Sequence, residues 1–262
     1  LKWADLIEAN ALEFAVLGVR DNGTEISMAY KAEPFSAIGT IRYYAEAIDK
    51  VYGEVAPTGP DTLGMILREP VGVVAAIVPW NFPMMIAAWK IAPALASGNS
   101  VVVKPSEMAS LTVMRMVALA LEAGLPDGVL NVVTGTGAVA GQALARSMDV
   151  DALAFTGSGG VGRQLMEYAA QSNLKRVFLE LGGKSPHIVF DDCADLDKAA
   201  TAVVNGIFRN AGQVCIAGSR LIVQRSIHDV FVKKITKLAA KMRVGDPLNM
   251  TTQVGALNSE LH

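Results

Sequence analysis

The sequence predicts an α/β protein built on a doubly wound parallel sheet. Between residues 71 and 181, short apolar runs alternate with longer stretches of helical spacing, a pattern typical of strand–helix–strand units. Hydrophobic residues make up 52% of the 262 residues, whereas aromatic residues make up only 6%. Strands buried on both faces favour this composition, because small and branched apolar side chains pack closely between a sheet and its covering helices.

The expected elements follow one another in a regular order. Helical spacing predicts a first helix over residues 1–18 and a second over 34–52, followed by a short strand at 62–68. The alternating part then has expected strands at 71–78, 101–103, 129–133, 152–155 and 176–181, and expected helices at 84–96, 111–123, 139–147 and 161–171.

A second and smaller α/β unit is expected to begin after Gly183. Its pattern repeats the strand–helix order of the first unit, with a loop that contains Cys215 between its two halves. The expected strands lie at 187–190 and 221–224, and the expected helices at 194–208 and 227–242.

Charge and cysteine content argue against several classes of protein. The formal net charge is -2 and no basic run is longer than a pair, so we expect no nucleic-acid partner. Two cysteines, Cys193 and Cys215, cannot form a disulfide framework, and no Cys/His spacing matches a zinc site, so we expect no metal. Free thiols favour a cytoplasmic location.

One uncharged run, residues 70–89, is long enough to cross a membrane. Gly72, Pro79, Asn81 and Pro83 interrupt it, and two prolines four residues apart would break a helix in hydrocarbon. The run therefore favours a buried strand, a loop and the start of a helix, and we expect no membrane partner.

In a doubly wound sheet, ligands bind beyond the carboxyl ends of the strands, so candidate functional residues are those that follow each strand. Cys215 follows a helix and a glycine-containing loop, where a thiolate could act as a nucleophile. From the thiol alone, a small buried hydrophobic residue is the favoured interpretation. Cys193 lies among aspartates, which raise a thiol pKa, so it is the poorer nucleophile.

Glu180 closes an apolar strand and precedes two glycines. Partial burial there would raise the pKa of its carboxyl group toward the range of a general base. An ordinary charge at the end of a strand explains the pattern equally well.

Polar residues also follow two earlier strands. Asn81 lies between two prolines, where its amide could stabilise an oxyanion or form a turn, and the pattern alone favours the turn. Lys104 and Glu107 follow the next strand and could hold a phosphate or ribose. A solvated ion pair at the start of a helix is at least as consistent with that pattern.

The segment Gly157-Ser-Gly-Gly-Val-Gly162 follows a strand and precedes a helix. It matches the Rossmann-like GxGxxG pattern, in which the N–H groups of a helix N-terminus hold a pyrophosphate. The acidic residue expected about 20 positions later to hold a ribose would be Glu180. The residues alone therefore leave Glu180 as either a ribose ligand or a base.

Five motifs follow one another along the chain: Pro79-Trp-Asn-Phe-Pro, Lys104-Pro-Ser-Glu107, Phe155-Thr-Gly-Ser, Glu180-Leu-Gly-Gly-Lys-Ser-Pro and Gly212-Gln-Val-Cys-Ile-Ala-Gly-Ser-Arg. In order and spacing this set resembles the motifs of the NAD(P)-dependent aldehyde dehydrogenase superfamily. The narrower resemblance is to bacterial 4-(γ-glutamylamino)butanal and aminoaldehyde dehydrogenases, through the segments that begin at Arg42 and Arg68.

The resemblance implies a role for each candidate in oxidising an aldehyde to a carboxylic acid. Cys215 is the nucleophile that forms a thiohemiacetal and then a thioester, Asn81 an oxyanion donor, Glu180 the base that activates water, and Lys90 an aid to proton movement. The implied cofactor is NAD, with NADP as a second option, and the implied cofactor-binding residues are Pro79, Trp80, Lys104, Glu107, Gly137, Gly157, Ser158, Gly162 and Leu181.

The resemblance also implies a domain plan and partners. We expect an NAD(P)-binding domain from residues 1–51 and 71–182, an oligomerisation strand segment at 52–70, and the beginning of an α/β catalytic domain at 183–262. The expected partners are a small-molecule aldehyde and further copies of the chain in a homo-dimer or homo-tetramer.

Members of the superfamily are close to twice this length, and their Glu-Glu-Ile-Phe-Gly-Pro motif has no match here. We therefore expect a chain truncated at both ends. Two alternatives to aldehyde oxidation stay open: an inactive dinucleotide-binding fragment, and a CoA-acylating relative that passes the same thioester to CoA. The retained Glu180 favours hydrolysis over the second of these.

Overall fold

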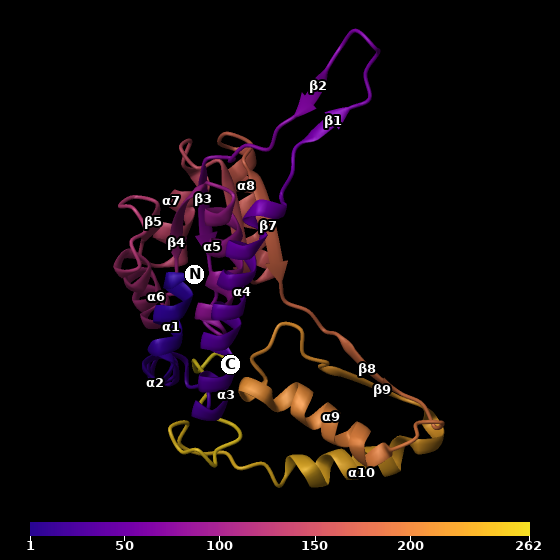
Figure 1. The fold of residues 1–262 in the computed structure, drawn as a ribbon. Coiled ribbons are helices and arrows are strands. Elements are labelled where there is room, and N and C mark those ends of the chain that lie inside the picture. The colour runs from indigo at the N-terminus through magenta and orange to yellow at the C-terminus, as the bar shows by residue number, and fades with distance from the viewer.

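The computed structural model describes residues 1–262 and contains a five-stranded, all-parallel sheet. Helices lie on both sides of this sheet (Figure 1), so the predicted doubly wound α/β class is confirmed. The strands are ordered β5-β4-β3-β6-β7 and span Leu130–Val132, Ser100–Lys104, Val73–Ile77, Ala152–Gly157 and Arg176–Leu181.

Alternate residues of β3 divide between two hydrophobic cores. Val74 and Ala76 pack into the larger core with α5 and α6, whereas Ala75 and Ile77 pack into the smaller core with α7 and α8. This follows from the strand period of two, which points successive side chains to opposite faces. These helices span Pro83–Ala96 (α5), Leu111–Glu122 (α6), Gln142–Arg146 (α7) and Gly159–Ala170 (α8).

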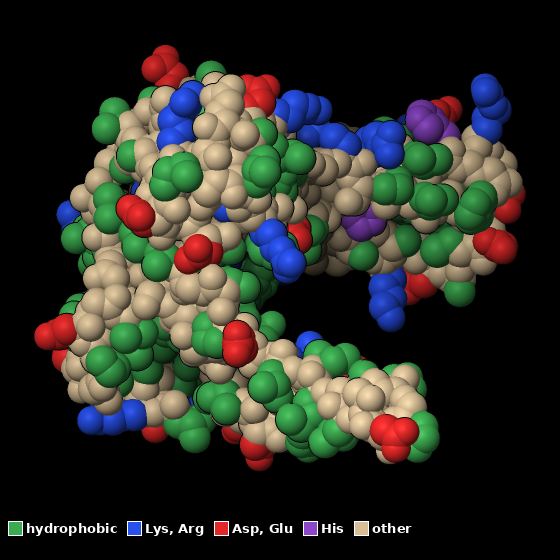
Figure 2. All heavy atoms as spheres, turned by 90° about the horizontal axis from the view of Figure 1, so that it is seen from above, with side chains coloured by type: hydrophobic (Ala, Val, Ile, Leu, Met, Phe, Trp, Pro, Cys, Tyr) green, Lys and Arg blue, Asp and Glu red, His purple; other side chains and the backbone are tan.

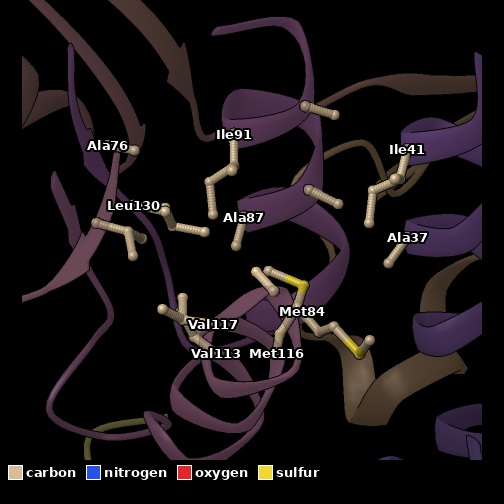
Figure 3. Packing of buried hydrophobic residues seen from close by; sticks show 14 of the residues in the cluster. Ala37, Ile41, Ala76, Met84, Ala87, Ile91, Val113, Met116, Val117 and Leu130 are labelled. Atoms are coloured by element: carbon tan, nitrogen blue, oxygen red, sulfur yellow. The ribbon is translucent and has the colours of Figure 1, made fainter. Parts of the chain in front are cut away.

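Helix α5 is the centre of the larger core. Figure 3 shows Ala87 and Ile91 of α5 between Ile41 of helix α4 (Glu33–Ala47) and Leu130 of β5. Small alanines on α5 let the helix approach the sheet closely. Because β3 runs directly into the loop before α5, this packing fixes the position of the loop that begins at Pro79.

The chain reverses direction across the sheet after β5. Strands β3, β4 and β5 extend outward on one side, and β6 then returns to the other side of β3 and pairs with it in parallel. Loops that leave β3 and β6 in opposite directions open a crevice at this topological switch point, where doubly wound proteins bind ligands.

The N-terminal helices differ from the prediction. The expected helix over 1–18 is wrong as a single element, because the chain turns at Asn10 between α1 (Lys2–Ala9) and α2 (Ala11–Asn22). A short helix α3 (Ile26–Lys31), which the sequence pattern did not predict, follows Gly23, whose φ of +78° ends α2 in a left-handed turn.

Two other expected helices are shorter or less regular than predicted. Helix α4 ends at Ala47, one 3₁₀ turn η1 (Ile48–Lys50) follows, and the chain is extended by Val51. The segment before α7 is a π-helical turn, η2 (Gly137–Gly141). Both differences lie at element ends, where sequence patterns locate boundaries least well.

An antiparallel hairpin of β1 (Glu54–Ala56) and β2 (Gly64–Ile66) projects from the body (Figure 1). The sequence pattern predicted the second of these strands but not the first. Val55 and Met65 of the hairpin are 70% and 65% exposed. Such an exposed apolar hairpin has too few partners to be stable through its own contacts alone.

The last part of the chain forms a second unit with two parallel strands covered by two helices (Figure 1). Phe231 is fully buried between these helices and Val189 of the sheet. Figure 2 shows arms that extend from the main body with hydrophobic side chains on their surfaces. The elements are β8 (Pro186–Val189), α9 (Leu196–Phe208), η3 (Arg209–Gly212), β9 (Arg220–Val223), η4 (Arg225–Ile227) and α10 (His228–Ala239).

The run over residues 70–89 is a strand, a loop and the beginning of α5, as predicted. No helix of the structure combines the length and the apolar character needed to cross a membrane.

A buried carboxyl group supports the start of α5. Glu33 is 9% exposed, its Oε2 accepts a hydrogen bond from the Met85 N–H at 2.8 Å, and its Oε1 has no partner. Burial raises the pKa of Glu33 to about 8, although hydrogen bonds from the α5 backbone oppose the shift.

We expect Glu33→Gln to remove a pH dependence of stability. The folded-state pKa of Glu33 lies above the ordinary value of 4.5, so the stabilisation by the neutral carboxyl group is complete below about pH 4.5 and is lost as pH rises through about 8. Glutamine keeps an oxygen for the Met85 N–H and stays neutral. The variant should gain free energy of unfolding over the wild type by at most ~1.4 kcal/mol per pH unit in this window.

Urea unfolding at pH 5 and pH 8 tests this expectation. Glu46→Gln is the matched control, because Glu46 lies exposed on the same helix. An equal difference between Glu33→Gln and wild type at both pH values would refute the assigned role of Glu33.

Candidate active site

A cavity of about 640 Å³ lies at the switch point of the sheet. Its walls come from the loop after β3, from the ends of β6 and β7 and the residues that follow them, from the loop before β9, and from residues 257–262, so five separated segments meet there. Seven of the predicted site residues line it: Pro79, Trp80, Asn81, Gly157, Ser158, Leu181 and Cys215.

The Asn81 side chain is fixed in one orientation. Its Oδ1 accepts a hydrogen bond from the Phe82 N–H at 3.1 Å, and its Nδ2 donates to the Gln213 carbonyl at 2.8 Å. Because these bonds use the oxygen and one N–H, the second N–H of the amide has no partner within the chain, and Asn81 lines the cavity.

Cys215 follows a tight loop that leaves α9. The loop places the half-buried Cys215 thiol in the cavity wall, and no intramolecular hydrogen bond uses the Cys215 N–H as its donor. A Cβ atom on Gly183 would lie 3.2 Å from the Cys215 carbonyl oxygen, which shows how closely the segment after β7 approaches this loop. The segment thus presents a thiol and a free N–H at one point.

The N-terminus of α8 faces the same cavity. The Ser158 hydroxyl accepts a hydrogen bond from the Val161 N–H at 3.3 Å and caps the helix. The N–H groups of Gly159 and Gly160 lie in the first turn and have no intrahelical acceptor. A Cβ atom on Gly162 would come within 2.9 Å of the Leu181 side chain, so glycine permits the close packing of α8 on β7.

Lys104, Glu107 and Gly137 form a second polar cluster beyond the end of β4. The buried Lys104 Nζ donates to Glu107 Oε2 at 2.9 Å, and the Gly137 N–H donates to Glu107 Oε1 at 3.4 Å. Partial burial raises the pKa of Glu107. These hydrogen bonds and the Lys104 charge together lower the pKa by more than burial raises it, so the resulting pKa is below the usual value. The carboxylate is therefore ionised and about half exposed.

Neither Glu180 nor Lys90 lines the cavity that contains Cys215, although Leu181 and Gly182, which follow Glu180 in the chain, do. Lys90 lines a separate hollow of about 830 Å³ over the α5 face of β6 and β7. Burial lowers the pKa of Lys90, and the negative charge of Glu180 offsets part of this shift, so the two groups interact. The expectation that Glu180 would be partly desolvated is wrong for this structure, because β7 is an edge strand and the Glu180 side chain is exposed.

Several residues at the site were missed by the sequence reasoning. Asn210 and Gln213 bond the Asn81 loop, and Asn22 bonds it from the end of α2. Asn22 lies in an Asp-Asn-Gly run that is typical of a helix end, and Asn210 lies five residues before Cys215. Their positions in the sequence gave no sign of burial, which depends on the meeting of distant segments.

The fold and the cavity define a class: a doubly wound α/β protein with a cysteine at its switch-point ligand site. Residues 1–262 match the aldehyde dehydrogenase family, and the chain belongs to this family.

The chain is 56% identical over 256 residues to the "NADP/NAD-dependent aldehyde dehydrogenase PuuC" of Escherichia coli K12, a match that covers 98% of this chain and 52% of PuuC. A solved indole-3-acetaldehyde dehydrogenase in complex with NAD⁺ matches with 52% identity and a TM-score of 0.97. The γ-glutamyl-γ-aminobutyraldehyde dehydrogenase of Burkholderia cenocepacia matches with 51% identity and the same TM-score. Each structural match covers 99% of this chain and 52% of the other.

These similarities confirm both the superfamily and the narrower resemblance recognised from the motifs. The chain spans about half the length of the relatives it matches.

Proposed function

We propose that the protein containing this chain oxidises an aldehyde to a carboxylic acid with NAD or NADP. The observation that supports this most directly is the hydrogen bond from the Asn81 amide to the Gln213 carbonyl. That bond joins the loop after β3 to the segment that contains Cys215, so that an amide donor and a thiol share one cavity. Similarity to dehydrogenases named for NAD and NADP supports the cofactor.

Cys215 and Asn81 perform the first step of the proposed reaction. The Cys215 thiolate attacks the aldehyde carbonyl carbon and forms a tetrahedral thiohemiacetal. The free N–H of Asn81 and the N–H of Cys215 donate hydrogen bonds to the oxyanion that develops. Such preorganised donors stabilise the transition state more than the ground state.

Loss of a hydride from this carbon turns the thiohemiacetal into a thioester on Cys215. A bound nicotinamide would supply the hydride acceptor. Glu180 then takes a proton from a water molecule that attacks the thioester, and the carboxylic acid leaves the thiol. Lys90 interacts with Glu180 and has a lowered pKa, so it is suited to pass a proton onward.

The residues around the cavity fit a dinucleotide. The free N–H groups in the first turn of α8, next to Ser158, suit a pyrophosphate, because a helix N-terminus attracts anions. The ionised Glu107 carboxylate suits two ribose hydroxyls. The close approach of α8 to β7 at Gly162 keeps this helix next to the carboxyl ends of the strands. Pro79, Trp80, Gly137, Gly157 and Leu181 complete the proposed cofactor-binding set.

A domain plan accompanies this function. We propose that residues 1–51 and 71–182 hold the cofactor and that 183–262 begin the catalytic domain. The exposed hairpin within 52–70 would pair with further copies of the chain in a homo-dimer or homo-tetramer, since its apolar side chains lack partners.

A product assay tests the proposed function. Reduction of NAD⁺ should depend on an added aldehyde, and the free acid should form at the same rate with and without CoA. Acyl-CoA as the main product would favour the CoA-acylating alternative. Cofactor binding without turnover by residues 1–262 alone, beside an active full-length protein, would favour the inactive-fragment alternative.

We expect Glu107→Ser to shift cofactor choice toward NADP. The 2′-phosphate of NADP adds about two negative charges, which the Glu107 carboxylate would repel. Lys104 is already paired with Glu107 and offsets only part of that repulsion. The ratio of kcat/KM for NADP to that for NAD should therefore rise by about tenfold or more, equivalent to ~1.4 kcal/mol.

The exposed Glu46 gives the control Glu46→Ser, which should leave the ratio unchanged. A wild type that already prefers NADP, or an unchanged ratio in Glu107→Ser, contradicts the role given to Glu107.

A further inference from the structure

Asn210 is the most deeply buried polar residue beside the proposed active site. It is 1% exposed, and its backbone has φ +49° and ψ +42°, in the left-handed region. Asparagine tolerates this conformation better than most residues, but the region is still uncommon for any residue with a Cβ atom. The fold therefore holds Asn210 in a particular conformation five residues before Cys215.

The Asn210 carboxamide bonds two segments of the site. Its Nδ2 donates to the Asn81 carbonyl at 3.1 Å and to the Gln213 carbonyl at 3.4 Å. The same Gln213 carbonyl accepts the hydrogen bond from the Asn81 side chain. The Asn210 amide thus joins the backbone of Asn81, the proposed oxyanion donor, to the backbone of Gln213, two residues before Cys215.

A third segment fixes the Asn210 carboxamide in this orientation. The Thr24 hydroxyl donates to Asn210 Oδ1 at 2.5 Å. Asn22 Oδ1 accepts from the Thr24 N–H at 3.0 Å, and Asn22 Nδ2 donates to the Trp80 carbonyl at 3.1 Å. The turn after α2, the Asn81 loop and the cysteine loop therefore form one buried hydrogen-bonded network.

We propose that Asn210 is a positioning residue, which sets the Cys215 loop against the Asn81 loop so that the thiol and the amide donor keep a fixed separation. Catalysis needs this separation, because a misplacement of ~1 Å between reacting groups can lower a rate by ~10²-fold. Asn210 lies behind the cavity and does not line it, so it acts through Asn81 and Gln213 rather than on substrate. The kinetic part of this inference rests on the proposed function.

Asn210→Gly is the main test, because glycine accepts the left-handed backbone and removes the carboxamide without adding charge. We expect kcat for aldehyde oxidation to fall by about tenfold to a hundredfold while the Kd for NAD⁺ changes less than about twofold. We also expect iodoacetamide to alkylate Cys215 at least about threefold faster, because the loop loses its restraint. A slower enzyme with a more accessible thiol is the signature of lost positioning.

Asn99→Gly is the matched control. Asn99 is also a buried asparagine with donor and acceptor bonds, to the Ala94 carbonyl and the Gly72 N–H, but it lies at the opposite end of the parallel strands. The variant should lose thermal stability without a change in kcat or in alkylation of Cys215. Equal changes in both variants, in proportion to their loss of Tm, would show a merely structural role and overturn the proposal.

Thr24→Val provides a second and milder test if Asn210→Gly does not fold. It removes only the hydroxyl that orients the Asn210 carboxamide, and should change kcat and alkylation in the same directions by a smaller factor. Wild-type behaviour of this variant in both assays would count against the proposal. If the wild type shows no aldehyde-dependent NADH, the proposed function fails, whereas the alkylation rates still decide whether Asn210 positions the loop.

Discussion

Replacing Cys215 with alanine is expected to abolish aldehyde oxidation while NAD⁺ binding survives. The thiol is the proposed covalent partner of the substrate, and removing the nucleophile of a catalytic set lowers kcat by about four orders of magnitude or more. The proposed cofactor-binding groups belong to other segments, at Ser158 and Glu107, and alanine at 215 does not remove them. NADH formation and NAD⁺ titration by fluorescence measure the two effects separately.

Cys193→Ala is the control for this experiment. Cys193 packs against the small core of the second unit and is half-buried, so its variant should keep turnover. Near wild-type turnover of Cys215→Ala, or labelling of Cys193 by an aldehyde-like electrophile in the wild type, would refute the assignment of Cys215.

Replacing Glu180 with glutamine is expected to slow release of the acid more than formation of the thioester. Glutamine keeps the shape of the side chain but cannot accept a proton from water, and loss of a general base lowers a rate by ~10²- to 10⁴-fold. The acyl-enzyme should therefore accumulate on Cys215 after a normal burst of NADH. Rapid quenching followed by mass spectrometry of the intact protein detects it.

An exposed carboxylate elsewhere, Glu167 on α8, gives the control Glu167→Gln, which should show no accumulation. A Glu180→Gln enzyme with an unchanged steady-state rate and no acyl-enzyme would contradict the base role. That result would leave the two other interpretations of Glu180 that the pattern allows, a ribose ligand or an ordinary charge at the end of a strand.

The exposure of Glu180 shows where sequence reasoning had too little information. An apolar strand that ends in a carboxylate suggests a buried base, but β7 is the edge strand and its last residues are covered by little of this chain. Burial of a strand end depends on what packs beside it, and local sequence does not specify that. The interaction of Glu180 with Lys90 was likewise visible only after β7 and α5 were placed together.

Glu33 is a second residue whose burial could not be predicted from the local sequence. It begins a helix, a position where an exposed acidic residue is common and stabilising. The structure instead packs it against the first turn of α5, where it is buried and one carboxyl oxygen has no partner. Only the packing of α4 on α5 turns an ordinary acidic residue into one with a pKa of about 8.

The strand–helix alternation, the parallel sheet and the polar residues that follow its strands were predictable from the sequence alone. These features depend on side-chain periodicity and on local backbone preferences, which are present in every short segment. The motifs around Asn81, Glu180 and Cys215 also identified the family without a structure.

Which polar groups are buried, and which partners they bond, depends on contacts between segments that are distant in the sequence. Thr24 and Asn210 are 186 positions apart and form one hydrogen bond, and Asn81 bonds Gln213 across 132 positions. A polar side chain is stable inside a protein when distant segments supply donors and acceptors in the right geometry. Folding alone brings those segments together, so the network that holds the Cys215 loop has no signature within any one of them.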